Sequence, residues 1–122
     1  MKSIFSTVLV AGLALLGCGA SASAAQFSWP TVDASSVHVL NYVCSEGVRF
    51  QVEYGNSDSG QSFALLPIQG QTWLLVETLA GSGVKYQAGP YTWWTKGKHA
   101  DLYDARAAQS WPPALSNCMA SD

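Results

Sequence analysis

One seven-residue stretch shows the architecture most clearly: Val48-Arg49-Phe50-Gln51-Val52-Glu53-Tyr54. Apolar and polar residues alternate through it without a break. Because successive side chains of a β-strand point to opposite faces, this pattern predicts a strand with one buried face and one face in water. The next residues, 55–60, are Gly, Asn, Ser and Asp, and they predict a turn.

Short segments of strand character continue on both sides of this stretch. Strands are predicted at residues 37–43, 63–68, 72–79, 84–87, 91–96 and 100–103, with turn residues between them. No segment has a sustained helical period. The sequence therefore predicts an all-β domain of about seven short antiparallel strands, either a barrel or a sandwich. Residues 26–36 are predicted as an irregular leader, and the tail at 106–122, which contains Pro112 and Pro113, as coil.

The N-terminal residues 1–25 have the organisation of a secretory signal peptide. A basic start is followed by an apolar run at 4–16 and small residues at 17–25. Two processing sites overlap there. Cleavage before Ala25 or Gln26, which we favour, would leave a periplasmic domain at 26–122. The alternative site, Leu15-Leu16-Gly17-Cys18, resembles a lipobox and predicts cleavage before Cys18, with lipid on that cysteine as an outer-membrane anchor.

Of the three cysteines, one lies in the predicted signal peptide and two lie in the rest of the chain. Cys18 is either removed with the signal peptide or modified by lipid, so Cys44 and Cys118 remain together in an oxidising compartment. They are predicted to form a disulfide, with the tail wrapping back so that Cys118 reaches Cys44. Closing a loop of this length stabilises the fold by about 4 kcal/mol in chain-entropy models.

The charge of the exported chain argues against a nucleic-acid partner. From Gln26 onward the chain has five Lys and Arg and eight Asp and Glu, and five minus eight gives a net charge near −3. Domains that bind nucleic acids are usually basic. A mildly acidic secreted domain associates more readily with a basic partner.

Residues 80–97 carry the features that point to function. A turn is predicted at residues 88–90, and the simplest hairpin is centred between residues 88 and 89. The cross-strand pairs of that hairpin are Tyr86–Tyr91, Val84–Trp93 and Ser82–Thr95. This register places Ser82 near Lys96 at the open end of the hairpin.

Alternation along residues 91–96 places one Trp on each face of the second arm. If Trp93 faces inward, Trp94 stands outside beside Lys96. An exposed Trp next to a Lys is typical of a binding hot spot. The alternative is that Trp94 packs beneath the tail that contains Trp111.

Two motifs in this region resemble those of a known family. Residues 82–86 fit the pattern S-G-x-x-Y, and residues 91–97 fit Y-x-x-x-T-K-G. The matching residues are Ser82, Gly83, Tyr86, Tyr91, Thr95, Lys96 and Gly97. In this order, together with the flanking cysteines and Tyr42-Val43-Cys44, they look like the signature motifs of the membrane-bound and periplasmic inhibitors of C-type lysozyme.

The resemblance implies a fold, a partner and two residue roles. The fold is a small eight-stranded antiparallel β-barrel, and the partner is C-type lysozyme, a basic host enzyme whose inhibition protects bacterial peptidoglycan. The serine of the first motif enters the lysozyme cleft and hydrogen-bonds the catalytic carboxyl groups, and the lysine of the second assists. These roles fall on Ser82 and Lys96.

The other motif residues are expected to shape this hairpin. Gly83 allows an unusual backbone conformation beside Ser82. Thr95 and Gly97 are expected to hold Lys96 in position. Tyr86 and Tyr91 are predicted to form a cross-strand aromatic pair.

Two other classes of function compete with inhibition. Five Trp could supply a barrel with sugar-stacking surface, so a periplasmic glycan or small-molecule binder is the alternative. An enzyme is not expected, because Gly81-Ser82-Gly83 lacks the G-x-S-x-G spacing of a nucleophile elbow. His38 and His99 lack the spacing of a metal site, so no metal and no cofactor are predicted. Asp101 and Asp104 are predicted to lie in a solvated turn.

Overall fold

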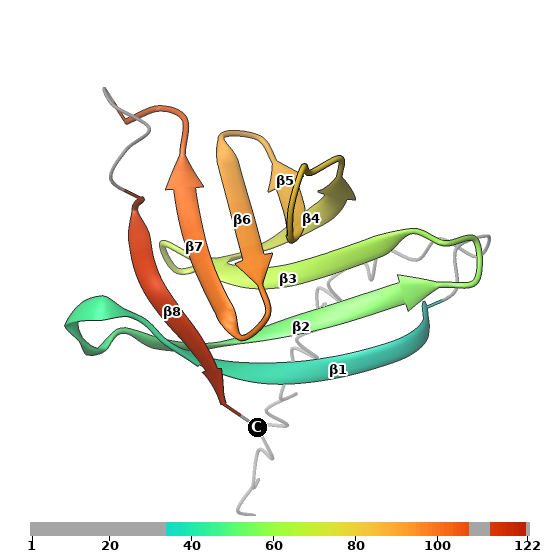
Figure 1. Ribbon diagram of the computed structural model, residues 1–122, viewed down its shortest axis with the longest axis horizontal. Coiled ribbons are helices and arrows are strands. Elements are labelled where there is room, and N and C mark those ends of the chain that lie inside the picture. The colour runs from blue at the N-terminus through green and yellow to red at the C-terminus, as the bar shows by residue number, and fades with distance from the viewer. Residues whose placement is uncertain (1–33, 108–112, 122) are drawn as a thin grey trace, which may run out of the picture.

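A computed structural model describes residues 34–107 and 113–121, which form a closed, eight-stranded antiparallel β-barrel (Figure 1). Each strand pairs with the next, and the last pairs with the first. The strands are β1 (Ala34–Val43), β2 (Arg49–Ser57), β3 (Ser62–Ile68), β4 (Gln71–Thr78), β5 (Val84–Ala88), β6 (Tyr91–Lys96), β7 (His99–Asp104) and β8 (Leu115–Ser121). A short 3₁₀ turn, η1 (Ser45–Gly47), follows β1. The predicted all-β class is confirmed, and the barrel is the correct one of the two architectures.

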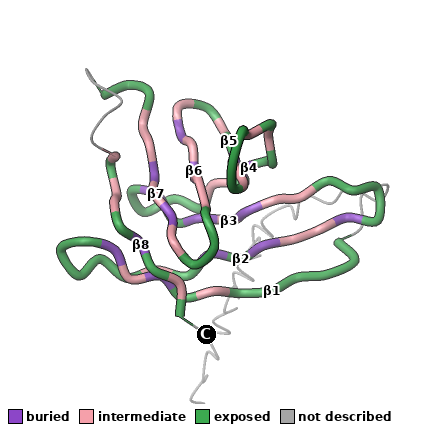
Figure 2. Tube along the Cα trace, in the orientation of Figure 1, coloured by how far each residue is buried: buried purple, intermediate pink, exposed green. Residues whose placement is uncertain are grey.

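The alternating stretch at 48–54 lies almost entirely in β2 and buries one of its sides. Val52 and Tyr54 are buried, whereas Arg49, Gln51 and Glu53 are exposed. Figure 2 shows buried segments on several strands that surround the interior of the barrel. The period-two pattern therefore identifies correctly which side of β2 faces the core.

Hydrogen-bonded aromatic residues occupy the centre of the core. Trp93 is 0 % exposed, and its Nε1–H donates to the Tyr54 hydroxyl over 2.8 Å. The hydroxyl oxygens of Tyr54 and Tyr42 lie 2.9 Å apart. Burial raises the pKa of Tyr54 far above its ordinary value, so its hydroxyl stays protonated. These polar groups satisfy one another inside the barrel, as buried polar groups must.

The C-terminal tail was predicted as coil, and this prediction is wrong. Leu115–Ser121 form β8, which pairs with β7 on one side and with β1 on the other. The strand lacks clear alternation, and Asn117 within it has a φ of 53°, so no local pattern identifies it. Its conformation follows from the backbone groups of β1 and β7, which would otherwise be unpaired edges.

The predicted disulfide between Cys44 and Cys118 is confirmed. It joins the residue after β1 to β8 across a separation of 74 residues, and both cysteines are buried. The bond therefore links the two strands that close the barrel.

The N-terminal predictions fall mostly outside the described residues. These include the signal peptide at 1–25, Cys18 and most of the leader at 26–36. The exception is residues 34–36, which belong to β1 and not to an irregular leader, because they pair with the far end of β2. Among the described residues, no helix has the length and apolar character needed to cross a membrane.

The connections between strands alternate between the two ends of the barrel, because consecutive strands are antiparallel. The β2–β3, β4–β5 and β6–β7 connections lie at one end. The β1–β2, β3–β4, β5–β6 and β7–β8 connections lie at the other. Ser82, in the β4–β5 connection, and Lys96, the last residue of β6, are therefore at the same end.

Candidate functional site

The β5–β6 hairpin is centred between Gly89 and Pro90, one residue later than predicted. Pro90 has no N–H for strand pairing, and Gly89 has a φ of 52°, as the first central position of a type II′ turn requires. The predicted pairs Tyr86–Tyr91, Val84–Trp93 and Ser82–Thr95 are therefore wrong; the observed pairs include Ala88–Tyr91, Tyr86–Trp93 and Val84–Thr95. Each partner shifts by two residues, a full strand period, so the predicted faces of β6 are retained.

Tyr86 and Tyr91 do not form the predicted aromatic pair, because the register separates them. Both are buried inside the barrel. The ring of Tyr86 lies 5.5 Å from that of Tyr54, and the ring of Tyr91 lies 4.9 Å from that of Trp73. Burial raises the pKa of Tyr86, so it is neutral at physiological pH. Both tyrosines hold the hairpin against the core and do not reach the outer surface.

Ser82 lies in the exposed β4–β5 connection, directly beside the end of β6. Its neighbour Gly83 has a φ of 64°. A Cβ at Gly83 would overlap the Thr95 carbonyl oxygen and would lie 2.7 Å from Cγ of Lys96. Only glycine tolerates this approach. The hairpin thus brings the Ser82 loop and Lys96 together, as expected from the sequence.

Trp94 connects these two groups on the outer face of β6. Its Nε1–H donates to the Ser82 carbonyl oxygen over 2.8 Å, and the Nζ of Lys96 lies 4.2 Å from the centroid of its ring. With Trp93 fully buried, the predicted outward position of Trp94 is confirmed. The alternative contact with Trp111 lies outside the described residues.

Thr95 and Gly97 flank Lys96 as expected, and each has a local structural role. The Thr95 hydroxyl donates to the Val84 carbonyl oxygen over 3.4 Å, which ties the end of β6 to the start of β5. Gly97 has a φ of 58° in the turn that leads to β7. Lys96 itself is exposed at this turn.

Two residues of this end were not identified from the sequence. The Nζ of Lys85 lies 4.1 Å from the centroid of the Trp94 ring, so two ammonium groups approach one indole. Lys85 could have been found from the alternation of side chains, because it pairs with Trp94 in the hairpin and both side chains therefore lie on the same face of the sheet. Leu79, in the same connection as Ser82, is 99 % exposed. A single exposed Leu has no periodic signature in the sequence.

At the end of the barrel that carries Ser82 and Lys96, the exposed polar groups can bind a partner through hydrogen bonds and charge. Within residues 34–107 and 113–121, no hydrogen bond to the Ser82 hydroxyl is found, so the hydroxyl can both donate and accept toward a partner. No group of three His, Cys, Asp or Glu side chains in the described part of the chain could hold a metal ion. Together with Lys96, this hydroxyl forms an exposed pair suited to carboxyl groups.

Asp101 and Asp104 were predicted in a solvated turn, but both lie in β7. They were misassigned because Asp is typical of turns, although Asp101 lies inside β7 and Asp104 ends it. Asp101 accepts a hydrogen bond from the backbone N–H of Asn117 over 2.8 Å. One of its oxygens lies 3.9 Å from Nε2 of His99. His38, on β1, lies 5.5 Å from the ring of Tyr54.

Asp104 forms an ion pair at the opposite end of the barrel. Its carboxylate accepts two hydrogen bonds from the Arg106 guanidinium, at 3.0 and 2.8 Å, and one from the Arg106 backbone N–H over 3.0 Å. These bonds lower the pKa of Asp104. Arg106 also donates to the Tyr91 hydroxyl over 2.6 Å. The group fixes the start of the β7–β8 connection to β6.

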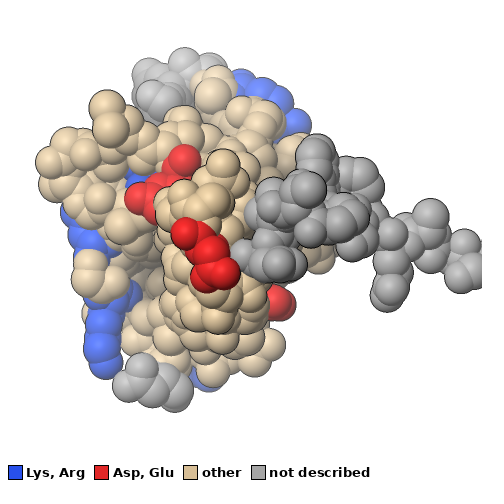
Figure 3. Space-filling model, turned by 90° about the vertical axis from the view of Figure 1, so that its right-hand side faces the viewer, with Lys and Arg blue, Asp and Glu red and all other residues tan. Residues whose placement is uncertain are grey.

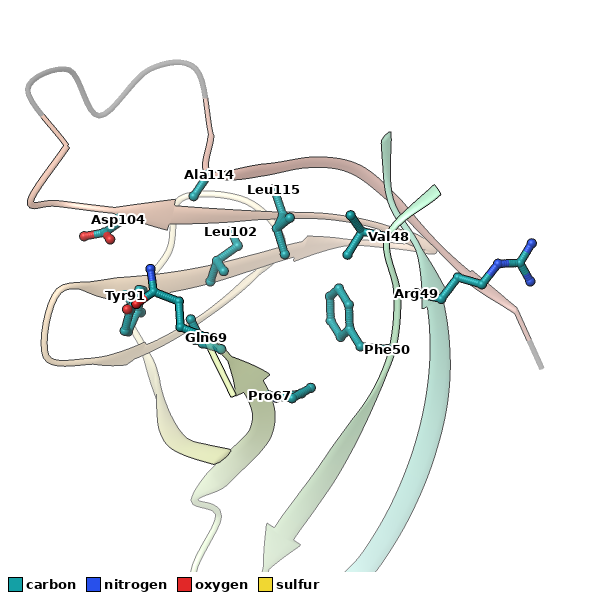
Figure 4. Close-up of a pocket in the computed structure, with 11 residues that line it drawn as sticks. Val48, Arg49, Phe50, Pro67, Gln69, Tyr91, Leu102, Asp104, Ala114 and Leu115 are labelled. Carbon is teal, nitrogen blue, oxygen red and sulfur yellow. The ribbon is translucent and has the colours of Figure 1, made fainter. Parts of the chain in front are cut away.

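A cavity of about 470 Å³ opens at this same opposite end. Its lining is mostly apolar, and Figure 4 shows Phe50, Pro67 and Leu102 around it with Arg49 pointing away. The cavity borders Tyr91, the first residue of β6, whereas Lys96 is the last. Because β6 spans roughly 17 Å, the cavity and the Ser82 loop are separate features.

The sequence of this chain is similar to sequences of known proteins. Residues 42–111 match the family model described as membrane-bound lysozyme inhibitor of C-type lysozyme. A protein of this description from Cupriavidus necator is 40 % identical over 91 % of this chain and 89 % of its own length. Another from Pseudomonas aeruginosa is 30 % identical over 84 % of this chain and 85 % of its own length.

Two solved structures share the fold. The P. aeruginosa inhibitor in complex with hen egg white lysozyme superposes with a TM-score of 0.63 and 30 % identity, over 82 % of this chain and 98 % of that one. The periplasmic inhibitor of C-type lysozyme from Salmonella typhimurium superposes with a TM-score of 0.62 and 25 % identity, over 71 % and 100 %. The chain therefore belongs to the family of membrane-bound lysozyme inhibitors of C-type lysozyme.

Proposed function

We propose that this protein inhibits C-type lysozyme by inserting the Ser82 loop into the active-site cleft, with Lys96 beside it. The observation that carries the proposal is the placement of a free Ser82 hydroxyl and an exposed Lys96 at one end of the barrel. It is supported by the family and by the relative whose structure was solved with hen egg white lysozyme.

The chemistry of the cleft fits these two groups. Lysozyme holds two carboxyl groups, one protonated as the general acid and one ionised. A serine hydroxyl can donate to the ionised group and accept from the protonated one. An ammonium group nearby pairs with the carboxylate and disfavours the neutral acid. Inhibition on this basis needs only occupancy, so the protein acts as a binding protein and not as an enzyme.

The distribution of charge supports the same partner. The exported chain has a net charge near −3, yet three of its five basic residues, Lys85, Lys96 and Lys98, lie between β5 and the β6–β7 turn. On the face shown in Figure 3, basic side chains lie mainly along the left edge and at the top, and acidic side chains lie near the middle and beside the basic ones on the left. An acidic domain with a local basic edge complements a basic enzyme whose cleft is acidic.

The site of action follows from export. Residues 1–25 are proposed as a signal peptide and 26–122 as the inhibitor domain, located in the periplasm. The alternative is an outer-membrane lipoprotein anchored through Cys18. Relatives described as membrane-bound and as periplasmic support a location in the cell envelope. There the protein would protect peptidoglycan from host lysozyme.

The test is to mix the purified mature protein with C-type, G-type and I-type lysozymes and to follow cell-wall lysis and binding. Inhibition restricted to the C-type enzyme is expected. Muropeptides serve as the second ligand, because the alternative function is glycan binding. The proposal would be contradicted if muropeptides quench the tryptophan fluorescence of the mature protein while C-type lysozyme stays fully active in its presence.

A further inference from the structure

We infer that Trp94 is a positioning residue that holds Ser82 and Lys96 in one arrangement before a partner arrives. This inference deepens the proposed function and rests on it. Neither motif assigns a role to Trp94, because it occupies a variable position of Y-x-x-x-T-K-G.

The first step is the hydrogen bond from the indole to the loop. The Nε1–H of Trp94 donates to the carbonyl oxygen of Ser82 itself, over 2.8 Å. The bond runs from the middle of β6 to a connection that belongs to no strand. It therefore fixes the backbone of the residue whose side chain is proposed to enter the cleft.

The second step is the backbone flexibility that residues 81–83 would have without the hydrogen bond from Trp94. Ser82 lies between Gly81 and Gly83, and glycine adopts more backbone conformations than any other residue. Residues 81–83 are exposed, as is Leu79 at the start of the connection. Ordering such a segment on binding costs conformational entropy, so a bond that orders it beforehand improves affinity.

The third step is the position of the cations. The Nζ atoms of Lys96 and Lys85 lie 4.2 and 4.1 Å from the centroid of the Trp94 ring. Cation–π attraction to Trp restrains both long side chains, which would otherwise repel each other and sample many rotamers. One indole thus orders a hydroxyl-bearing loop and two ammonium groups on the same outer surface. A partner with a carboxylate pair would meet them already in place.

The test compares Trp94→Phe, which keeps an aromatic ring but removes the N–H, with Trp73→Phe as a matched control. Trp73 is half-buried on β4 and borders the opposite end of the barrel through Tyr91. In the free mature protein, ¹⁵N relaxation should show the order parameters of Ser82 and Gly83 falling from near 0.85 to below about 0.6 in Trp94→Phe only. Trp94→Tyr, which also lacks the N–H, is the second variant if Trp94→Phe fails to fold.

Binding to C-type lysozyme is the second measurement. Loss of one hydrogen bond should weaken the Kd of Trp94→Phe by roughly three- to tenfold, with Trp73→Phe near wild type. In the Ser82→Ala background the same change should weaken binding less, because Trp94 acts through the Ser82 loop. A merely structural role of Trp94 would give additive losses.

The outcomes separate the inference from the function on which it rests. If the order parameters of Ser82 and Gly83 are unchanged in Trp94→Phe, the inference is overturned, whether or not the variant still binds lysozyme. Altered order parameters with unchanged Kd, or additive losses with Ser82→Ala, overturn it as well. Failure of the wild-type protein to bind C-type lysozyme overturns the proposed function and with it the role of this ordering, while the relaxation data still report whether Trp94 orders the loop.

Discussion

At the scale of the residue, Gly83 explains how Ser82 of the first motif and Lys96 of the second, which are separated by the whole β5–β6 hairpin, come to lie at one surface. Its missing side chain allows the loop to approach the Thr95 carbonyl and the stem of Lys96. Any larger residue would overlap the end of β6 and would also be strained at a φ of 64°. The proposed binding surface therefore depends on a residue that has no side chain with which to contact a partner.

The residue-scale prediction concerns Ser82 and Lys96. Truncating one partner of a desolvated charged contact costs about 2 to 5 kcal/mol, so Lys96→Ala should weaken inhibition at least tenfold. In the proposed mode of binding, Ser82→Ala leaves carboxyl groups of the cleft unpaired, so we expect a loss of roughly 1 to 3 kcal/mol. Because both groups address the same pair of carboxyl groups in the proposed mode of binding, the double variant should lose less than the sum of the single losses. Dissociation constants at low and moderate salt measure each effect.

Thermal melts provide the control for these variants, since a loss of folding would imitate a loss of contact. Both residues are exposed, so the melting temperatures should stay near that of wild type. Full inhibition by the folded double variant would mean that another part of the surface enters the cleft.

At the scale of the element, the β7–β8 connection begins with an ion pair that links β7 to β6. Arg106 bonds to the Asp104 carboxylate and to the Tyr91 hydroxyl, and its guanidinium lies 5.1 Å from the centre of the Tyr91 ring. These contacts anchor the connection beside the cavity at the end far from Ser82. They affect stability and leave the proposed binding surface untouched.

This ion pair predicts a dependence of stability on pH. The pKa of Asp104 is lower in the folded protein than its ordinary value of 3.8. A group with a depressed pKa stabilises the fold above its unfolded pKa and loses that contribution as the pH falls through the folded pKa. Asp104→Asn should therefore lower the melting temperature by a few degrees at pH 7, and the difference should shrink below about pH 4.

Asp58→Asn, which removes one exposed carboxylate from the β2–β3 turn, is the matched control for charge. Its melting temperature should stay close to that of wild type at pH 7. A deficit for Asp104→Asn that persists undiminished at pH 2 would show that the side chain stabilises the fold by some means other than its charge.

At the scale of the whole molecule, the barrel places the Ser82 loop and the cavity at opposite ends. The disulfide and β8 close the barrel, and the buried Tyr42, Tyr54 and Trp93 fill its centre. The loop with Ser82 projects from one end, and the cavity opens at the other. The disulfide and β8 thus close the barrel without any contribution from the loop that carries Ser82.

The whole-molecule prediction concerns export and anchoring. Replacing Cys18 with Ala should leave the protein in the soluble periplasmic fraction, as in wild type, because the favoured cut before Ala25 or Gln26 discards that cysteine. Fractionation of cells followed by immunoblotting measures the distribution. A wild-type protein in the membrane fraction that becomes soluble on Cys18→Ala would establish the lipoprotein alternative.

The approximate positions of seven of the eight strands, the all-β class, the inward side of β2 and the opposite faces of Trp93 and Trp94 on β6 could be predicted from the sequence. The alternation of apolar and polar residues is a local property of each strand. If the predicted pairing of two strands is wrong by two residues, every side chain is still assigned to the correct face of the sheet. For the same reason Trp94 was placed correctly outside although the hairpin register was wrong. The disulfide was also predictable, because Cys18 lies in the predicted signal peptide and only Cys44 and Cys118 are then left to pair.

Features that depend on contacts between distant segments required the tertiary structure. The strand character of residues 115–121 comes from pairing with β1 and β7, which no local pattern encodes. The contacts of Lys85 and Lys96 with one indole, and the bond from that indole to Ser82, depend on the true hairpin centre and on the close approach at Gly83. A sequence records alternation and turn residues, whereas these contacts arise only when the barrel closes and brings separate strands to one end.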